Sequence, residues 1–199
     1  MRWLRRVGSE EVIAAWLKHE YQNRTDFKAM VDSQIPQYVG VIANPNLGNI
    51  AENQARLSII TQYRPFVSSI AAADWWVTEI DKVDFTELKL IDSGDWRFIT
   101  DETPDPTRAA KKIDKDTNLR NGIYSRQVSF ILNRYKQLSL SSYRIVIVCA
   151  NKEGPFTVVD GVHRTVAMAL YHFVRVHEPF AKKEAYAGLI GRPFDLHFS

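Results

Sequence analysis

The run at residues 160–165 holds the chain's most concentrated set of groups that could bind an anion. It reads, in order, Asp160, Gly161, Val162, His163, Arg164 and Thr165. The β-branched residues before it predict a strand, and the spaced apolar residues after it predict a helix that starts at Val162. A helix N-terminus offers unpaired backbone N–H groups and about half a unit of positive charge, which together favour phosphate.

The side chains of this run extend the same prediction. Gly161 allows a sharp turn and a close approach of a ligand to the backbone. His163 and Arg164 add donors, and the planar fork of arginine suits phosphate. Thr165 adds a hydroxyl in the first turn. Asp160 would repel bare phosphate, so we expect it to bind Mg²⁺, to orient His163 or to act as a base.

The same spacing also fits an ordinary strand–turn–helix junction. In that interpretation Asp160 is the N-cap, Gly161 is a turn glycine, and His163 and Arg164 lie on a solvated helix start. Such junctions are common, so the spacing alone leaves both interpretations open.

The elements around this run predict an α/β (or α+β) fold. Residues 1–73 show two helical patterns, at 9–21 and 51–63, and we expect them to form a helical extension. Residues 74–199 form the main domain, with a polar excursion at 92–122 that has at most short helices. The expected order is a strand at 75–83, a helix at 124–138, a buried strand at 143–150, a strand at 156–159, the helix from Val162, and a last strand at 184–190.

The run Val158–Ala169 resembles the ParB/sulfiredoxin superfamily, whose hallmark is a strand, Asp-Gly-x-His-Arg and an alanine-rich helix. The resemblance covers about residues 75–190, and the order of elements fits it. It implies a small mixed sheet of the ParB/sulfiredoxin type. Sulfiredoxins carry a catalytic cysteine where this chain has Val162, so that thiol chemistry is not expected here.

The Asp-Gly-x-His-Arg form looks most like the ParB-like small-molecule kinases. This branch implies that Asp160, His163 and Arg164 lie near the phosphates of ATP or ADP, with CTP as a further candidate, and that Asp160 holds Mg²⁺. The implied reaction is phosphoryl transfer to a small-molecule hydroxyl. Arg126 is a candidate second phosphate contact or a surface ion pair. The carboxylate that positions the acceptor has candidates by position only: Glu79, Asp81, Asp92, Asp95 and Glu102.

A ParB-like nucleic-acid or nucleotide-responsive binding module, with or without nuclease activity, is the alternative function. ParB proteins carry a downstream DNA-reading domain, whereas about 20 residues follow the motif helix here. The net charge of +3 and isoelectric point near 8.9 permit a phosphate ligand but fall short of a dense basic face. A third hypothesis is an interaction domain without catalytic activity.

Composition also predicts where the protein is located and which cysteine chemistry it can carry. The longest clean apolar run, Ile145–Ala150, is far shorter than the roughly 20 residues of a membrane-spanning helix. Arg2, Arg5 and Arg6 are not followed by the apolar segment of a secretion signal, so we expect a cytoplasmic protein without a membrane partner. The single cysteine, Cys149, excludes an internal disulfide and lies in an apolar run typical of an inert core thiol. The oligomeric state stays open.

Overall fold

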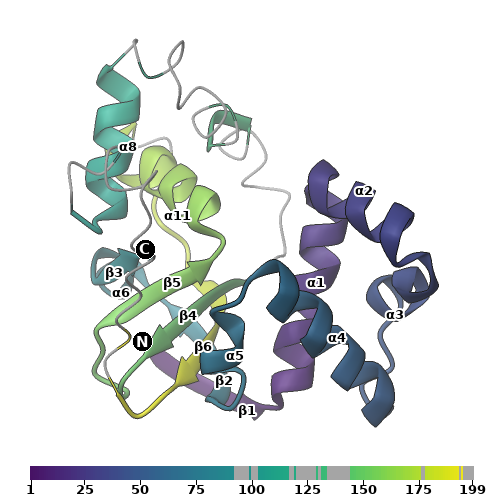
Figure 1. Ribbon diagram of the computed structural model, residues 1–199. Helices are drawn as coiled ribbons and strands as arrows, with labels where there is room; N and C mark the ends of the chain where they lie inside the picture. The colour runs from purple at the N-terminus through teal and green to yellow at the C-terminus, as the bar shows by residue number, and fades with distance from the viewer. Residues whose placement is uncertain are drawn as a thin grey trace. The chain divides into compact units, whose positions relative to one another are not determined.

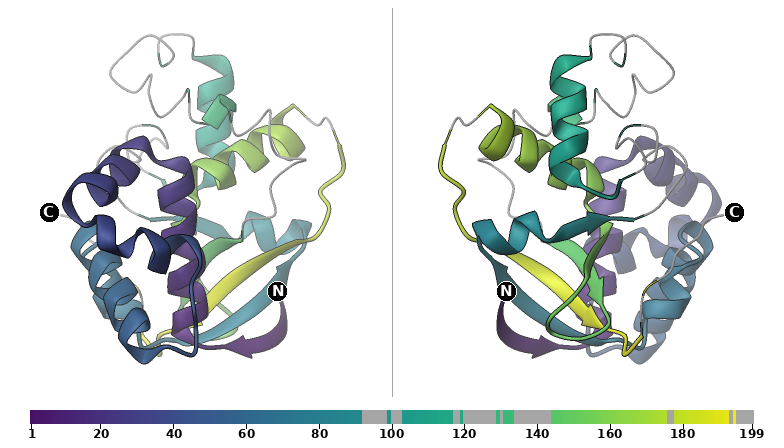
Figure 2. Two further views of the ribbon diagram at one scale, coloured as in Figure 1. Left: turned by 90° about the vertical axis from the view of Figure 1, so that its right-hand side faces the viewer. Right: turned by 90° about the vertical axis from the view of Figure 1, so that its left-hand side faces the viewer.

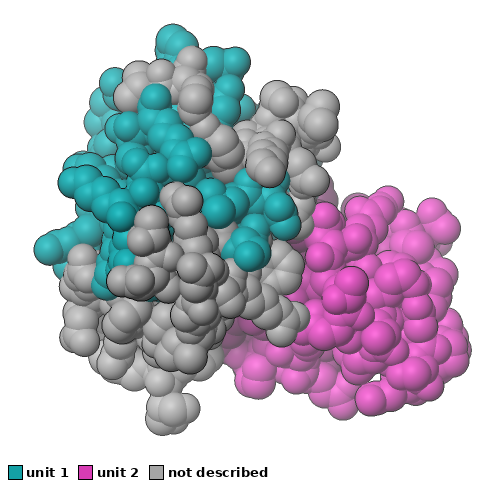
Figure 3. Space-filling model, turned by 90° about the horizontal axis from the view of Figure 1, so that it is seen from above, with its two compact units in different colours: residues 1–5, 77–199 teal, residues 6–76 magenta. Residues whose placement is uncertain are grey.

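The computed structural model describes residues 1–91, 99, 103–116, 119, 129, 131–133, 144–175, 178–192 and 194 (Figure 1). The chain forms two compact units, which are coloured separately in Figure 3. The sheet unit comprises Met1–Arg5 and Val77–Ser199, and the helical unit comprises Arg6–Trp76. The chain therefore leaves the sheet unit after its first residues and returns to it through a later strand.

The helical unit confirms both helices that the sequence predicts in this region. Its elements are α1 (Ser9–Asn23), α2 (Thr25–Gln34), η1 (Pro36–Tyr38), α3 (Val39–Ala43), α4 (Ile50–Tyr63) and α5 (Val67–Ile70). The sequence pattern did not predict α2, because only Phe27 and Val31 of this helix are buried and two apolar positions make a weak periodic signal.

A six-stranded mixed sheet confirms the expected α/β class. Its strands are β1 (Arg2–Val7), β2 (Asp74–Ile80), β3 (Leu88–Leu90), β4 (Ile145–Cys149), β5 (Phe156–Asp160) and β6 (Lys183–Leu189). Their order across the sheet is β1-β2-β6-β4-β5-β3. Strand β5 runs parallel to β3 and antiparallel to β4, and β4 runs parallel to β6. All five residues of β4 are buried, as its continuous apolar run predicts.

Strand β1 differs from the expectation that residues 1–73 are helical. It is an edge strand, and Arg2, Leu4, Arg5 and Arg6 are exposed on it. An edge strand is held by backbone pairing with one neighbour and needs few buried side chains, so its sequence carries little periodic signal. The half-buried ring of Trp3 lies 5.3 Å from the ammonium of Lys152.

The capping signal after β2 lies three residues earlier than the sequence suggested. Residues 84–87 have the Asp-x-x-Glu form of a capping box, which predicts a helix start at Asp84. In the structure Asp81 instead caps α6 (Lys82–Thr86) and exchanges hydrogen bonds with Asp84. The Asp84 N–H donates to Asp81 Oδ1 at 3.0 Å, and the Asp81 N–H donates to Asp84 Oδ2 at 3.0 Å. The shift follows from β2, which ends at Ile80 rather than Val83.

Two helices pack against each other on one side of the sheet (Figure 2). They are α8 (Pro106–Lys115), a regular helix within the polar excursion at 92–122, and α11 (Val162–Ala169). Helix α11 continues as a π-helical turn, η3 (Leu170–Val174), where the Arg175 N–H donates to Leu170 O at 2.9 Å. Most of the helix expected at 124–138, and most of the excursion outside 103–116, lie outside the described residues.

Within the described part of the chain, no helix combines the length and the apolar character that a membrane span requires.

Candidate functional site

The junction between β5 and α11 requires glycine. Asp160 is the last residue of β5, and Gly161 follows it with a φ of 84°, in the left-handed region. A Cβ on Gly161 would lie 2.7 Å from Cγ2 of Ile145, the first residue of β4. Both the backbone conformation and the close approach of β4 therefore exclude a larger residue without local strain.

The N-cap residue of α11 is Gly161, which has no side chain to cap the helix. The first hydrogen bond of the helix runs from the Thr165 N–H to Gly161 O at 2.8 Å. The backbone N–H groups of Val162, His163 and Arg164 precede that bond and point out of the helix end. Backbone N–H groups at the start of a helix are donors that can bind an anion.

Two residues of opposite charge are buried at this junction. Asp160 is 9% exposed and Arg164 is 6% exposed, whereas His163 is half-buried. Electrostatic interactions are stronger in such a dry environment than at the surface, so both charges act strongly on any group bound beside them. The acid, the imidazole and the guanidinium that the sequence singled out therefore belong to one junction, the end of β5 and the first turn of α11.

Thr165, the first-turn hydroxyl that the sequence singled out, has a structural partner in this turn. Its side chain is fully buried, and its hydroxyl donates to Gly161 O at 3.1 Å. This bond ties the first turn of α11 to the glycine that precedes it. The sequence could not separate the two roles, because a first-turn threonine has the same spacing in both.

The junction lies where two parallel strands end side by side. Leu90 of β3 is in register with Val158 of β5, and the Ile91 N–H donates to Val158 O at 3.1 Å. In open α/β sheets, ligands bind outside the carboxyl ends of parallel strands. The end of β5, and with it the start of α11, therefore lies at a position that commonly holds ligands.

The structure narrows the set of acceptor-positioning carboxylates. Glu79 accepts a hydrogen bond from Lys182 Nζ at 2.9 Å, and this bond lowers the pKa of the Glu79 carboxyl. Asp81 caps α6, where hydrogen bonds from backbone N–H groups lower its pKa. Both carboxylates thus have structural partners. The other candidates, Asp92, Asp95 and Glu102, lie outside the described residues, as does Arg126.

A metal ion at this site would depend on Asp160. The described residues contain no group of three or more His, Cys, Asp or Glu side chains that could hold a metal ion. Mg²⁺ at nucleotide sites needs only one or two carboxylates, because substrate phosphates and water complete its octahedron. The buried carboxylate of Asp160 beside an anion site fits such a hard cation.

Cys149 behaves as the sequence predicts for a core thiol. It is fully buried in β4, and its Sγ lies 3.7 Å from Gly188 O in the neighbouring strand β6. Burial raises the pKa of the Cys149 thiol to about 12. The thiolate that nucleophilic chemistry needs is therefore absent near neutral pH.

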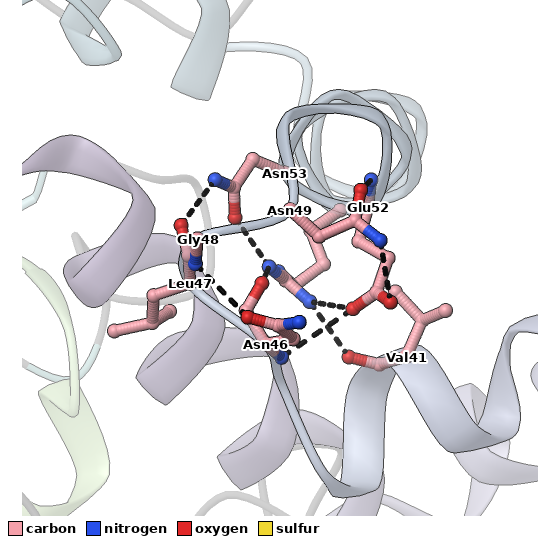
Figure 4. Close-up of polar contacts among 8 residues, drawn as sticks. Val41, Asn46, Leu47, Gly48, Asn49, Glu52 and Asn53 are labelled. Carbon is pink, nitrogen blue, oxygen red and sulfur yellow. Dashed lines mark hydrogen bonds and ion pairs between the residues drawn. The ribbon is translucent and has the colours of Figure 1, made fainter.

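A second polar cluster, in the helical unit, was not predicted (Figure 4). It surrounds Arg56 of α4, whose side chain is fully buried. The guanidinium donates to Val41 O and Asn46 O, each at 3.0 Å, and to the side chains of Glu52 and Asn53. Its role is to fix the loop before α4. A signal was present in the Asn-rich segment 44–53, but a lone arginine on a helix normally indicates a solvated face.

No family model matches the chain, and neither the curated proteins nor the solved structures contain a match.

Proposed function

We propose that the protein binds a nucleotide at the N-terminus of α11 and catalyses Mg²⁺-dependent phosphoryl transfer from ATP or ADP to a hydroxyl of a small molecule. The observation that carries the proposal is the burial of two oppositely charged residues, Asp160 and Arg164, at a helix start whose N-cap residue is Gly161. The resemblance to ParB-like kinases supports it, and a sheet of the ParB/sulfiredoxin type is part of the proposal.

The residues take distinct roles in this reaction. The backbone N–H groups at the start of α11, together with His163 and Arg164, stabilise the charge of the transferred phosphoryl group. Asp160 would hold Mg²⁺, which neutralises phosphate charge when bound, or would orient His163. The acceptor oxygen forms a bond to phosphorus as the bond to the leaving phosphate oxygen breaks. The hydroxyl proton passes to a carboxylate, for which Asp92, Asp95 and Glu102 are the remaining candidates.

Phosphorus NMR of ATP, Mg²⁺ and the protein, with and without a pooled extract of small metabolites, tests the reaction. We expect a new phosphoester signal only when the extract is present. Asp160→Asn should abolish the signal, whereas Glu87→Gln, which removes an exposed carboxylate of the same unit, should leave it unchanged. A phosphoester formed equally by Asp160→Asn would refute the role of this site.

Nucleotide affinity tests the site separately from turnover. Arg164→Lys keeps the charge but loses the planar fork, and a lost charge-assisted hydrogen bond of about 1.5–3 kcal/mol corresponds to a Kd raised at least tenfold. Circular dichroism establishes that the variant is folded. An unchanged Kd would overturn the site assignment. Binding without turnover of any acceptor would instead favour the nucleotide-responsive binding module.

A further inference from the structure

Residues 33–63 of the helical unit form a long segment that is almost without charge. Glu52 and Arg56 are its only charged residues, although 25% of the residues in the whole chain are charged. The structure describes every residue of this segment. Arg56 is fully buried and lies 3.3 Å from the Glu52 carboxylate, so the two charges neutralise each other within the protein. The surface that this segment presents to solvent therefore carries no net charge.

The exposed residues of α4 lie on a single uncharged face. They recur mainly at every fourth position, and at 3.6 residues per turn they fall within an arc of roughly 120°. With one residue of the preceding loop they form what we call the α4 face, which comprises Leu47, Ile50, Ala51, Gln54, Ser58 and Gln62. Helix α2 of the same unit differs, because it exposes the charged residues Asp26, Lys28 and Asp32 within ten residues.

Two aliphatic side chains are exposed at the N-terminal end of the α4 face. Ile50 is 73% exposed and Leu47 is 40% exposed, and they are two of the four large hydrophobic side chains exposed on the described surface. The Leu47 carbonyl accepts a hydrogen bond from Asn53 Nδ2 at 2.8 Å, which ties Leu47 to the start of α4. Scattered exposed aliphatic residues are ordinary, whereas a pair within an uncharged surface is typical of the core of an interface.

The loop that carries Leu47 is held in place by the protein itself. The buried guanidinium of Arg56 donates to the carbonyls of Val41 and Asn46, each at 3.0 Å. The Gly48 N–H donates to Asn46 Oδ1 at 3.1 Å, and the Leu47 side chain points away from these bonds (Figure 4). Association costs less conformational entropy when the contact surface is already ordered. The buried arginine thus prepares the α4 face for a partner.

We propose that the α4 face is the interface of a homodimer, in which a second copy of this chain packs against it about a two-fold axis near Ile50. Leu47 and Ile50 of both copies form the apolar core of this interface. The amides of Asn46 and Gln54 form its polar rim, in the usual arrangement of a protein–protein contact. The small side chains of Ala51 and Ser58 leave room for the aliphatic side chains of the other copy.

The lack of charge favours a second copy over other partners. A two-fold axis places each residue of an interface near its own copy. An amide both donates and accepts hydrogen bonds, so it can pair with its own copy, whereas a charged group would meet a like charge. An acidic or basic partner fits less well, because its charges would lose water without gaining an opposite charge on this face.

Analytical ultracentrifugation at protein concentrations from about 1 µM to about 1 mM tests the association. We expect the monomer of 22.9 kDa at low concentration and a particle of twice that mass at high concentration. Small interfaces are typical of weak complexes, so the midpoint should lie within this range.

A matched pair of variants distinguishes the α4 face from other exposed apolar residues. Ile50→Glu brings two like charges together at the two-fold axis and should raise the dissociation constant at least about tenfold. The new acid lies in the first turn of α4, where the helix dipole favours it, and circular dichroism checks that the variant is folded. The control is Val83→Glu, because Val83 is 69% exposed and also lies in the first turn of a helix, α6. It should dimerise as the wild type does.

A mixture of Ile50→Glu and Ile50→Lys tests the two-fold arrangement. Each variant alone should be mainly monomeric where the wild type dimerises, because like charges face each other. The mixture should form dimers, because opposite charges then meet at the axis. Sedimentation of one fluorescently labelled variant, with and without the other, measures this association.

Three results would overturn the proposal. They are a wild type that stays monomeric throughout, an equal loss of dimer in Ile50→Glu and Val83→Glu, or a mixture that does not associate. A monomeric wild type would leave the α4 face to another segment of this chain or to a different protein. The inference does not rest on the proposed nucleotide site. Arg164→Lys should dimerise as the wild type does, and Ile50→Glu should bind ATP as the wild type does.

Discussion

Replacement of Gly161 by alanine is expected to destabilise the protein through two separable effects. Alanine in the left-handed region costs about 1–2 kcal/mol. The new Cβ would lie 2.7 Å from Ile145 Cγ2, in a buried and β-branched side chain that cannot turn away, and such overpacking costs about 1–3 kcal/mol. The sum of about 2–5 kcal/mol is a large part of the 5–15 kcal/mol that holds a typical protein folded.

A double-mutant cycle with Ile145→Ala isolates the contact. Ile145→Ala alone leaves a cavity and should cost about 2–5 kcal/mol. In that background Cγ2 is gone, so Gly161→Ala should cost only the backbone part, about 1–2 kcal/mol. The two substitutions together should therefore be less destabilising than the sum of the single changes by about 1–3 kcal/mol. Urea unfolding, with the slope compared between variants, measures each free energy.

Gly161→Asn separates the backbone effect from the contact in a second way. Asparagine tolerates the left-handed region better than alanine but has the same Cβ, so it should keep mainly the contact cost. If Gly161→Ala cost the same free energy with and without Ile145, the close approach of β4 would not be the reason for glycine, and the explanation of this turn would be wrong.

Three further predictions concern single residues. Arg56→Met should destabilise the helical unit by about 3 kcal/mol, because Val41 O, Asn46 O and the side chains of Glu52 and Asn53 all lose their donor, and hydrogen exchange in residues 44–49 should rise. Burial raises the pKa of the Cys149 thiol from 9.0 to about 12, so the thiol keeps its proton in the folded state and the free energy of unfolding should fall as pH rises above 9. Cys149→Ala should remove this pH dependence, and Cys149 in the folded protein should resist iodoacetamide. The hydrogen bond from Arg24 lowers the Asp26 pKa from 3.8 to about 2, so this bond stabilises the folded state above pH 3.8 and the stabilisation is lost as pH falls through 2. Asp26→Asn should make the free energy of unfolding depend less on pH in this range.

The sequence predicted the elements whose apolar pattern is dense. Strand β4 and helix α4 follow from continuous and periodic apolar residues, and their burial is what produced those patterns. Strand β1 and helix α2 were missed for the converse reason, because backbone pairing or only two buried side chains hold them in place. The spacing of apolar residues in a sequence indicates which side chains are buried, but it carries no information on backbone hydrogen bonds to a distant strand.

In the candidate site, too, the sequence predicted some features and could not predict others. The motif placed Asp160, Gly161 and Arg164 at one turn, which follows from their adjacency in the chain. The contact between Gly161 and Ile145 could not be predicted, since it depends on the pairing of β4 with β5. The lack of charge in residues 33–63 is visible in the sequence, but its concentration on one exposed face of α4 needed the helix boundaries.

The position of the helical unit between β1 and β2 has a consequence for the order of folding. These two strands are neighbours in the sheet, yet residues 8–73 separate them in the chain. Closing a loop of that length costs about 3 kcal/mol more entropy than closing a two-residue hairpin. In the folded structure an ion pair joins Arg6 and Asp74, at the two ends of this loop. Helices that form first would bring these ends together and lower that entropy cost. We therefore expect β1 to join the sheet last, and pulse-labelled hydrogen exchange should show the amides of α1 and α4 protected before those of β1.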